Sequence, residues 1–343
     1  MVQRATIHDL ARAAGVSTAT VDRVLNGRLT VRAATAQRVY DAARQIGYHA
    51  AGLIGHRLQA DVPLLRLGFV LHKERQAFYQ NFAAEILTAA KAVPGIRVET
   101  TIGFAASQSP GDFTKLMLGM KGKVDAIAAT CVAHHEITEA VQALKQDGIP
   151  CFALLNDFAQ GVRQHYVGLN NLQVGRIAAS MMGTAIHRPG KLAVFVGGYR
   201  WHGHDLRETG FRGYLREMAP QFTVLYTLVN LETRQLTYEA TLDLLARHPD
   251  LRGIYLAGGG MEGAIAALRE ARQPGEVALV VNELTPESRA ALRDHYLVMV
   301  ISTPLATLCR DLMILMRDTV RSGGPEILGQ HFLQPDLYIA ESV

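Results

Sequence analysis

Residues 6–27 read TIHDLARAAGVSTATVDRVLNG, and this stretch decides how the start of the chain folds. Thr6 precedes an amphipathic run over residues 7–14, and the acid three positions later stands where a capping box needs it. Gly-Val-Ser then interrupts the run, and Ser17 offers a cap for a second helix over residues 18–26. The stretch therefore predicts two short helices joined by a tight, glycine-containing turn.

A third helix is expected over residues 33–46, with Gly47 as its terminator. Two short helices braced by a third are typical of a helix-turn-helix, whose second helix enters the major groove of DNA. A generic three-helix bundle is the alternative. On the second helix, Thr18, Ala19, Asp22 and Arg23 are expected on the exposed face, and Val21, Val24 and Leu25 on the buried face.

Positive charge is concentrated in the same part of the chain. Residues 1–60 contain eight Arg and three Asp, a net charge of +5, whereas the rest of the chain has 27 basic and 28 acidic side chains, a net charge of −1. This asymmetry favours a polyanion as the partner of the N-terminal part, although a solvated basic face gives the same count.

The stretch over residues 6–27 resembles the DNA-binding head of the lactose-repressor (LacI/GalR) family. The family pattern runs Thr, hydrophobic, any, Asp, hydrophobic, Ala, then Ala-Gly-Val-Ser, Thr-Val-Ser-Arg and Leu-Asn, and nearly every fixed position is present here. The resemblance implies that Arg23 is a bidentate guanine reader, with a phosphate contact as the alternative. It also implies that Thr18 and Ala19 read base edges and that Thr6, Ser17, Thr20 and Asn26 hold phosphates.

Two departures from the family pattern affect this expectation. Asp22 replaces the usual Ser, so a carboxylate lies beside DNA, where it accepts from a cytosine amino group or positions Arg23 and weakens attraction to phosphates. After Tyr48 the family has Pro-Asn and then Ala-Arg-x-Leu, a hinge helix that wedges a Leu into the minor groove. Here residues 49–58 read HAAGLIGHRL, without Pro or Asn and with two glycines. Leu58, one residue late, or Leu53 is the candidate wedge.

With 343 residues the chain is too long for one ordinary domain. From Leu65 onward, short apolar runs alternate with amphipathic stretches, which is typical of α/β folds with parallel sheets covered on both faces. We predict two doubly wound lobes, over residues 64–168 and 170–297, which the end of the chain returns to complete. The predicted strands are 66–71, 97–102, 124–130, 151–155, 192–196, 223–229, 253–257, 277–281 and 298–302, and helices include 82–92, 137–147, 174–186 and 261–272.

This long segment is similar to the periplasmic sugar-binding-protein fold (type 1) that forms the effector domain of the LacI/GalR family. The stretch 167–171 resembles the family's V-G-x-D-N, 207–211 its R-x-x-G-F, and 338–342 its terminal strand. The resemblance implies a helix-turn-helix domain over 1–49, a hinge over 50–63, and a two-lobed effector-binding and dimerisation domain over 64–343. No leucine-heptad helix follows, so a homodimer is expected.

The resemblance also implies an effector site in the cleft between the lobes. Phe78 and Tyr79 match an aromatic pair that stacks on a sugar ring, unless they only start a helix and pack. Arg207 matches a guanidinium that binds ligand hydroxyls, with a surface salt bridge as the alternative. Asn156 and Asp157 stand where the family often has Asp-Arg, and Glu283 stands near a recurrent ligand-binding Asp.

Other positions depart from the family's site. Residues 258–260 are Gly-Gly-Gly where Asn-Asp is frequent, and Thr303 stands near a common Gln. The effector is therefore not expected to be held as ribose or a purine would be. Trp201, His202 and His204, in the loop expected before Arg207, are candidates for replacement contacts.

These features predict a cytoplasmic, sequence-specific transcriptional regulator, in this architecture most often a repressor. Its expected partners are double-stranded operator DNA and a small polar effector such as a sugar, a polyol or a derivative. An α/β enzyme is the first alternative, but residues 68–73 carry no GxGxxG or P-loop, and no cofactor is expected. A non-exported small-molecule-binding protein is the second alternative. A free transport-binding protein would require export, and the opening residues lack the apolar core of an export signal.

Metal, disulfide and membrane roles are not expected. The His134-His135 and His202-x-His204 pairs lack partners at metal-ligand spacing. Cys131, Cys151 and Cys309 are expected to be reduced core thiols. The most apolar late segment, 299–316, is interrupted by Pro304, Arg310 and Asp311, so no membrane span is predicted.

Overall fold

The computed structural model describes residues 5–26, 31–60, 63–323 and 328–343, apart from the side chains of residues 33 and 56–60. Backbone contacts divide the chain into two compact units, one with residues 1–65 and 94–98 and the other with the remainder. Residues 5–60 are called the head below, and residues 63–343 the two-lobed domain.

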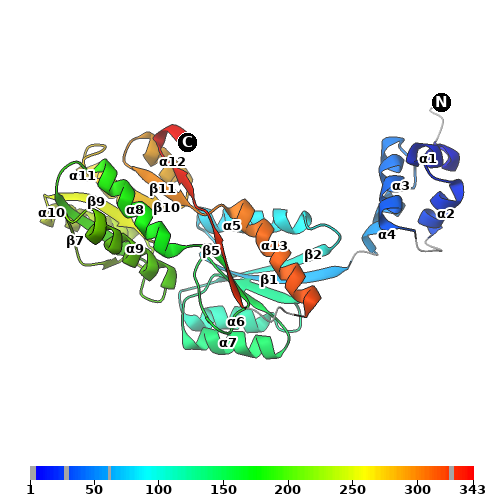
Figure 1. The fold of residues 1–343 in the computed structure, drawn as a ribbon, viewed down its shortest axis with the longest axis horizontal. Helices are drawn as coiled ribbons and strands as arrows, with labels where there is room; N and C mark the ends of the chain where they lie inside the picture. Colours follow the sequence, from blue (N-terminus) through cyan, green and yellow to red (C-terminus); the bar gives the residue numbers. More distant parts are fainter. Residues whose placement is uncertain (1–4, 27–30, 61–62, 324–327) are drawn as a thin grey trace. The chain divides into compact units, whose positions relative to one another are not determined.

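Local capping forms the first two helices of the head as the sequence predicts. The Thr6 hydroxyl accepts the Asp9 N–H at 3.3 Å and the Asp9 carboxylate accepts the Thr6 N–H at 2.9 Å, a complete capping box. Gly15 ends the first helix with φ +64°, and Ser17 Oγ accepts the Thr20 N–H at 3.2 Å at the start of the second. The helices of the described head are α1 (Ile7–Ala14), α2 (Thr18–Asn26), α3 (Ala33–Gln45) and α4 (Ala51–Ala60) (Figure 1).

Helix α4 occupies most of the predicted hinge, and it packs on the head. Ile54 is fully buried in the head core together with Leu10 and Val39. The Tyr40 ring lies against Gly55, where an added Cβ would come within 2.7 Å of Tyr40 Cε2. Leu53 on the same helix is half exposed. The side chain of Leu58, a predicted wedge, lies outside the described residues.

Lobe 1 is built on a sheet with the strand order β12-β5-β4-β3-β1-β2. Its central pairs, β1 with β3, β3 with β4 and β4 with β5, are parallel, and so is β12 with β5. Helix α13 packs beside α5, and α6 packs beside α7 (Figure 1). The strands are β1 (Leu64–His72), β2 (Arg97–Ala105), β3 (Ala126–Ala129), β4 (Cys151–Leu154), β5 (His165–Leu169) and β12 (Gly329–Leu333); the helices are α5 (Ala77–Lys91), α6 (Pro110–Gly119), α7 (His135–Gln146) and α13 (Leu305–Ser322).

Lobe 2 is built on a second sheet with the order β13-β11-β10-β9-β6-β7, and β8 also pairs with β6. All the recorded pairs are parallel except β11 with β13. The strands are β6 (Gly190–Val196), β7 (Phe222–Val224), β8 (Leu228–Val229), β9 (Leu251–Leu256), β10 (Ala278–Asn282), β11 (Met299–Ser302) and β13 (Asp336–Tyr338); the helices are α8 (Asn171–Ala185), α9 (His202–Met218), α10 (Arg234–Arg247), α11 (Met261–Ala271) and α12 (Pro286–Arg293).

The end of the chain returns to both lobes, as predicted: α13 and β12 complete lobe 1, and β13 completes lobe 2. The predicted strand 223–229 is wrong as one element, because it divides into β7 and β8. The predicted terminal strand 338–342 is also wrong. β13 ends at Tyr338, and a 3-10 turn over Ala340–Ser342 follows, in which Ser342 Oγ accepts the Ile339 N–H at 2.9 Å.

Each lobe has its own apolar core under its sheet. Phe113, Met117 and Ile127 belong to the core of lobe 1, and Ile254, Leu268 and Leu279 to that of lobe 2. The three cysteines are free and buried, which confirms the expected core thiols. Among the described residues, no helix has the length and hydropathy that a membrane span requires.

Candidate functional site

A cavity of about 110 Å³ lies between the two lobes. Its lining includes Thr130 and Asn156, which follow β3 and β4, and Gly258 and Glu283, which follow β9 and β10. The cavity is therefore at the carboxyl ends of strands from both sheets, where doubly wound folds bind ligands. Of the residues predicted for the effector site, the lining includes Phe78, Tyr79, Asn156, Trp201, Arg207 and Glu283.

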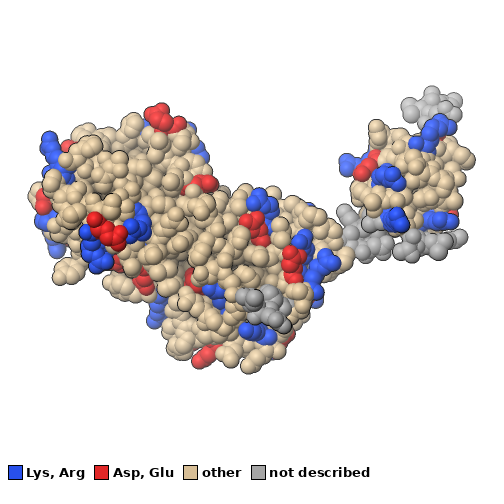
Figure 2. Space-filling model, viewed as in Figure 1, with Lys and Arg blue, Asp and Glu red and all other residues tan. Residues whose placement is uncertain are grey.

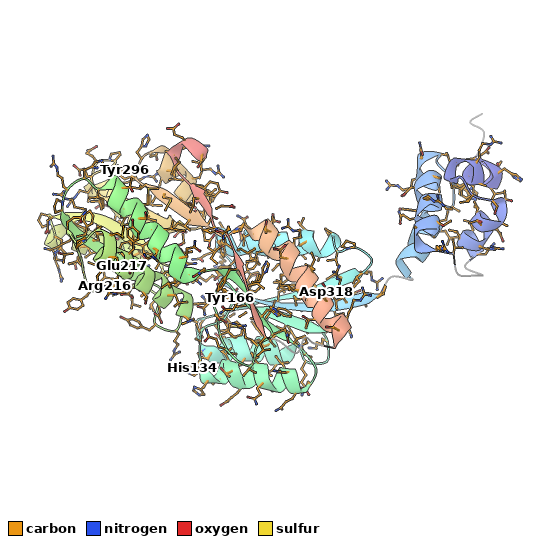
Figure 3. All side chains as sticks on the ribbon, in the orientation of Figure 1. His134, Tyr166, Arg216, Glu217, Tyr296 and Asp318 are labelled. Carbon is orange, nitrogen blue, oxygen red and sulfur yellow. The ribbon has the colours of Figure 1, made fainter. Side chains whose placement is uncertain are left out.

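Arg207, in the second turn of α9, is buried and held by neutral acceptors. Its Nε–H donates to Asn171 Oδ1 at 2.7 Å, and its Nη1–H donates to the Ala257 carbonyl at 2.8 Å. Asn171 is held in turn, because its Nδ2 donates to the hydroxyl of Tyr166 at 3.1 Å. Figure 3 labels Tyr166 among the side chains of the two-lobed domain. These bonds fix the guanidinium plane and do not use Nη2. Within the described chain Arg207 has no carboxylate partner, so the surface salt bridge is excluded.

Glycines on α8 and α9 let the two helices approach closely. An added Cβ at Gly210 would clash with the Leu172 carbonyl, and one at Gly175 would clash with the Arg207 carbonyl. Close approach of two helix backbones is the physical reason for glycine at both positions. Phe211 then stacks on Tyr255 of β9 with ring centroids 5.1 Å apart, which anchors α9 on the sheet.

Asn156 and Trp201 join the two lobes at the cavity. Asn156, in lobe 1, donates to the Cys131 carbonyl at 2.6 Å and accepts the Gly203 N–H of α9 at 2.7 Å. Trp201 is the N-cap residue of α9, yet its indole is only 3 % exposed and belongs to the apolar core of lobe 1. The residues expected in a loop before Arg207 therefore begin a helix, and His204 lies in its first turn.

Phe78 and Tyr79 lie in the first turn of α5, which begins five residues earlier than predicted. Their rings meet edge to face with centroids 5.2 Å apart. Tyr79 is buried, whereas Phe78 is partly exposed, and both line the cavity. The pair therefore does start a helix and pack, and at the same time it offers aromatic surface to a ligand.

Glu283 lines the cavity from lobe 2, and its backbone has a left-handed conformation with φ +72°. Its carboxylate accepts the Thr303 hydroxyl at 2.7 Å, the Thr303 N–H at 2.9 Å and the Ser302 hydroxyl at 3.2 Å. Burial raises the pKa of this carboxyl, and the bonds from Thr303, the nearby Arg207 charge and the bond from Ser302 oppose that rise. Thr303 thus positions Glu283 from the next strand.

Asp157 does not line the cavity. Its carboxylate forms a buried bidentate pair with Arg163, with Nε–Oδ1 at 2.5 Å and Nη2–Oδ2 at 2.8 Å. The Nη1–H of Arg163 donates to the Gly329 carbonyl at 2.7 Å, so the pair attaches β12 to the loop after β4. The position after Asn156 therefore serves the fold of lobe 1, and we remove Asp157 from the candidate site.

Glu232 lines the cavity although its sequence context gave no sign of it. Its Oε2 lies 3.0 Å from Lys73 Nζ, and its Oε1 accepts the Gly259 N–H at 3.1 Å. Burial alone would raise the pKa of this carboxyl, but the Lys73 charge, His204 and these bonds lower it to about 2. The only sequence feature that could have indicated Glu232 is the run of three glycines at residues 258–260, which leaves room at the cavity for a side chain from another loop.

His204 faces Glu232, with its Nε2 3.7 Å from Glu232 Oε1. The Gly197 N–H donates to His204 Nδ1 at 3.1 Å, so in the neutral ring the proton lies on Nε2, toward the carboxylate. Burial lowers the pKa of His204 to about 4, although Glu232 opposes this. The ring is therefore neutral at pH 7 and offers one N–H donor to this end of the cavity.

Two buried polar atoms on the cavity wall have no partner in the described structure. They are Thr130 Oγ1, from lobe 1, and Asn282 Oδ1, from lobe 2. The Nδ2 of Asn282 is already used, since it donates to the Leu256 carbonyl at 2.6 Å. Buried polar groups are normally hydrogen-bonded, so one such atom on each lobe is suited to a bound polar ligand.

The head presents the predicted reading face on α2. Val21 and Val24 are buried, whereas Ala19, Asp22 and Arg23 are exposed and Thr18 is partly exposed. Asp22 does not hold Arg23: its Oδ1 accepts the Asn26 amide at 2.6 Å. Among the described residues the Arg23 side chain has no partner.

The predicted phosphate contacts of the head already have local partners. Thr6 Oγ1 lies 2.6 Å from the Asp9 carboxylate, and Ser17 and Thr20 hydroxyls lie 2.9 Å apart. Thr6 and Ser17 are exposed and Thr20 is partly exposed, and all three lie at or near a helix N-terminus, where N–H groups attract anions. On the side shown in Figure 2, Lys and Arg side chains predominate over acidic ones on the head.

One group of possible metal ligands, His134, His135 and Glu136, exists among the described residues. It lies at the start of α7, largely exposed, and His134 Nδ1 accepts the Glu136 N–H at 3.4 Å as an N-cap. Capping accounts for this geometry, and no metal role is assigned to it.

Comparison with known proteins gives a family to both units. The model of bacterial regulatory proteins of the lacI family matches residues 6–50, and the periplasmic binding protein domain model matches residues 67–318. The chain belongs to the LacI family, with a periplasmic-binding-protein domain. This LacI-family chain is therefore a DNA-binding transcriptional regulator, as its head predicts.

Curated relatives and solved structures agree with this assignment. The regulator is 26 % identical to the HTH-type transcriptional regulator GntR of Pseudomonas aeruginosa, over 81 % of this chain and 79 % of that protein. It is 24 % identical to the HTH-type transcriptional regulator GalS of Salmonella typhimurium, over 77 % and 75 %. A solute binding protein of Burkholderia graminis in complex with D-arabinose has the same two-lobed fold, with a TM-score of 0.75 and 18 % identity, over 82 % of this chain and 97 % of that chain.

Proposed function

We propose that this LacI-family regulator is a repressor that binds operator DNA as a homodimer in the cytoplasm. Its affinity for the operator changes, either falling or rising, when a sugar occupies the cavity between its lobes. The observation that carries the proposal is one chain with two sites: an exposed helix with an unpartnered Arg23, and a polar cavity around a buried Arg207. Binding rather than catalysis is the proposed role of the cavity.

On the DNA side, α2 enters the major groove and Arg23 makes a bidentate contact with guanine. Thr18 and Ala19 contact neighbouring base edges. Thr6, Ser17, Thr20 and Asn26 contact phosphates, and Asn26 exchanges its bond to Asp22 for one to DNA. Asp22 is then free to accept from a cytosine amino group, which makes it a second specificity residue.

On the effector side, the cavity supplies what a polyhydroxylated ring requires. Phe78 and Tyr79 offer aromatic faces, and Arg207 offers donors that its protein bonds do not use. Thr130 and Asn282 offer one unpaired atom from each lobe. Several solved structures with this fold contain a bound sugar, such as D-allose in a protein of Actinobacillus succinogenes, and this supports a sugar as the effector.

A selection from random duplex DNA, followed by titration at several salt concentrations, tests the proposal. We expect a preferred duplex whose affinity falls steeply with salt, because Arg side chains displace counterions. Arg23→Ala should remove about 1–3 kcal/mol of discrimination between the preferred duplex and others.

Arg12→Ala is the matched control, because Arg12 is an exposed Arg of α1. It should weaken binding to all duplexes alike and leave discrimination intact. If the wild type prefers no sequence, or if the two variants lose discrimination equally, α2 is not the reading helix.

A further inference from the structure

Glu232 reaches the cavity from the short loop between β8 and α10. Both Leu231 and Glu232 have left-handed backbone conformations, with φ +49° and +53°, which non-glycine residues adopt only when the surroundings hold them. Asn230 holds them here: its Oδ1 accepts the Glu232 N–H at 2.8 Å, and its Nδ2 donates to the Gly259 carbonyl at 2.8 Å. The side chain is thus directed at the cavity by a defined loop.

The glycines around the cavity make room for this carboxylate. An added Cβ at Gly259 would lie 3.0 Å from Glu232 Cβ, and one at Gly197 would clash with the Glu232 side chain. An added Cβ at Gly258 would lie 2.5 Å from the His204 ring. The glycines that remove side chains from residues 258–260 therefore admit Glu232 and His204 in their place.

The same carboxylate is held from the other lobe. Lys73 follows β1 of lobe 1, with φ +49°, and its Nζ lies 3.0 Å from Glu232 Oε2 and donates to the Glu232 carbonyl at 2.9 Å. Gln108, also of lobe 1, accepts the Trp201 Nε1–H at 3.1 Å and lies 3.5 Å from Glu232 Oε2. The Lys73 and Glu232 side chains are 17 % and 12 % exposed, so water screens their attraction little.

We propose that Glu232 contacts the effector and is positioned for this by Lys73, so that one end of the effector site is complete only when the two lobes are together. This inference rests on the proposed sugar effector. Glu232 is the contact residue, and Lys73, which is not part of the cavity wall, is the positioning residue.

The chemistry of the carboxylate defines what it recognises. An ionised carboxylate accepts hydrogen bonds and has about four lone-pair sites. Gly259 and Lys73 use two of them at close range and Gln108 uses a third at 3.5 Å, which leaves one acceptor site for the ligand. Arg207 only donates, so the cavity has a donor group and an acceptor group on its wall. A ligand with hydroxyl or amine donors at one end and hydroxyl or ring-oxygen acceptors at the other matches both.

The experiment uses the full chain and a panel of free monosaccharides that includes D-allose, D-arabinose and D-tagatose. The sugar that most raises the unfolding temperature of the wild type is titrated against Glu232→Gln, Lys73→Met and Lys73→Arg. Glu232→Gln and Lys73→Met should each weaken binding about tenfold or more, because each removes a charged hydrogen-bond partner. Lys73→Arg should restore most of the affinity, which a purely structural role of Lys73 would not predict.

A second measurement needs no ligand. Trp201 is the chain's only tryptophan and is buried in lobe 1 while attached to lobe 2, so its quenching by acrylamide reports separation of the lobes. Quenching should rise in Glu232→Gln and Lys73→Met. The matched control is Glu208→Gln, which neutralises a similar part-buried pair, with Arg212, inside lobe 2. It should leave both affinity and quenching unchanged.

Each outcome decides a separate claim. If no sugar of the panel binds the wild type, the sugar effector is wrong, and the contact role of Glu232 is lost with it. If a sugar binds and Glu232→Gln binds it equally well, the sugar effector stands and Glu232 is not a contact. If Lys73→Met matches the wild type in affinity and quenching, the lobes are not joined through this pair.

Discussion

At the scale of single residues, some charged side chains of this regulator are paired inside the protein, and others have no charged partner in it and are available to a ligand or to DNA. Asp157 and Arg163 satisfy each other inside lobe 1, so they belong to the fold. Arg207 is buried but bonded only to an amide and a carbonyl, and Arg23 is exposed without a partner among the described residues. A buried charge without a charged partner destabilises the fold. The paired Arg163 therefore has a structural role, whereas Arg207, which has only neutral acceptors, is suited to bind a ligand.

His204 gives a prediction about pH. Its pKa is about 4 in the fold and about 6.5 in an unfolded chain, so between these values only the unfolded chain binds the proton. Stability therefore falls as pH falls from 6.5 to 4, by up to about 3 kcal/mol from this residue. His204→Gln keeps a donor toward Glu232 and should lose less stability between pH 7 and pH 5, measured as the urea midpoint of the two-lobed domain. Below pH 4.5 the depressed pKa of Glu232 adds to the loss in both proteins.

The control for this prediction is His187→Gln, at an exposed position of the same lobe. The urea midpoint of His187→Gln should change between pH 7 and pH 5 by the same amount as that of the wild type. Equal losses in the wild type and in His204→Gln would mean that the buried ring is not the group that titrates.

At the scale of elements, local signals were predictable and long-range ones were not. The bounds of α1 and α2 follow from caps within a few residues, so the sequence was enough to place them. β5 and β12 were missed because His, Gln and Gly interrupt their apolar character, and pairing with other strands makes them strands: β5 pairs with β4, and β12 pairs with β5. The role of Glu232 was not predicted either, because it depends on a long-range contact with Lys73, which lies 159 positions away in the sequence.

Helix α4 gives a prediction that separates stability from DNA binding. Ile54→Ala should destabilise the head by about 2–4 kcal/mol, because it opens a cavity in a small core. Hydrogen exchange of the α1 and α3 amides measures this loss. Leu53→Ala, on the same helix and half exposed, should leave exchange unchanged and weaken operator binding if Leu53 is the minor-groove wedge.

One result for each variant would contradict these assignments of Ile54 and Leu53. An Ile54→Ala head with wild-type protection would mean that α4 does not belong to the head core. Unchanged operator affinity in Leu53→Ala would leave Leu58 as the wedge candidate.

At the scale of the whole molecule, the two units have separate cores, and this gives the last prediction. The head core is formed by α1 to α4, whereas the cores of the lobes involve residues from 65 onward. Deleting residues 1–60 removes no side chain from the cavity wall, all of which lies between Gln76 and Thr285. The truncated protein should therefore bind the same sugar within about twofold, since no contact is lost, and should show no affinity for DNA.

The same truncated protein locates the dimer interface. If dimerisation belongs to the two-lobed domain, light scattering should give twice the mass of the truncated chain, independent of DNA. A monomer that still binds sugar would move the interface to the head, and the two heads would then be held together directly. In that case effector binding would have to act on operator affinity through the link between the units within one chain, because the lobes of the two chains would not be joined and their closure would not change the spacing of the heads.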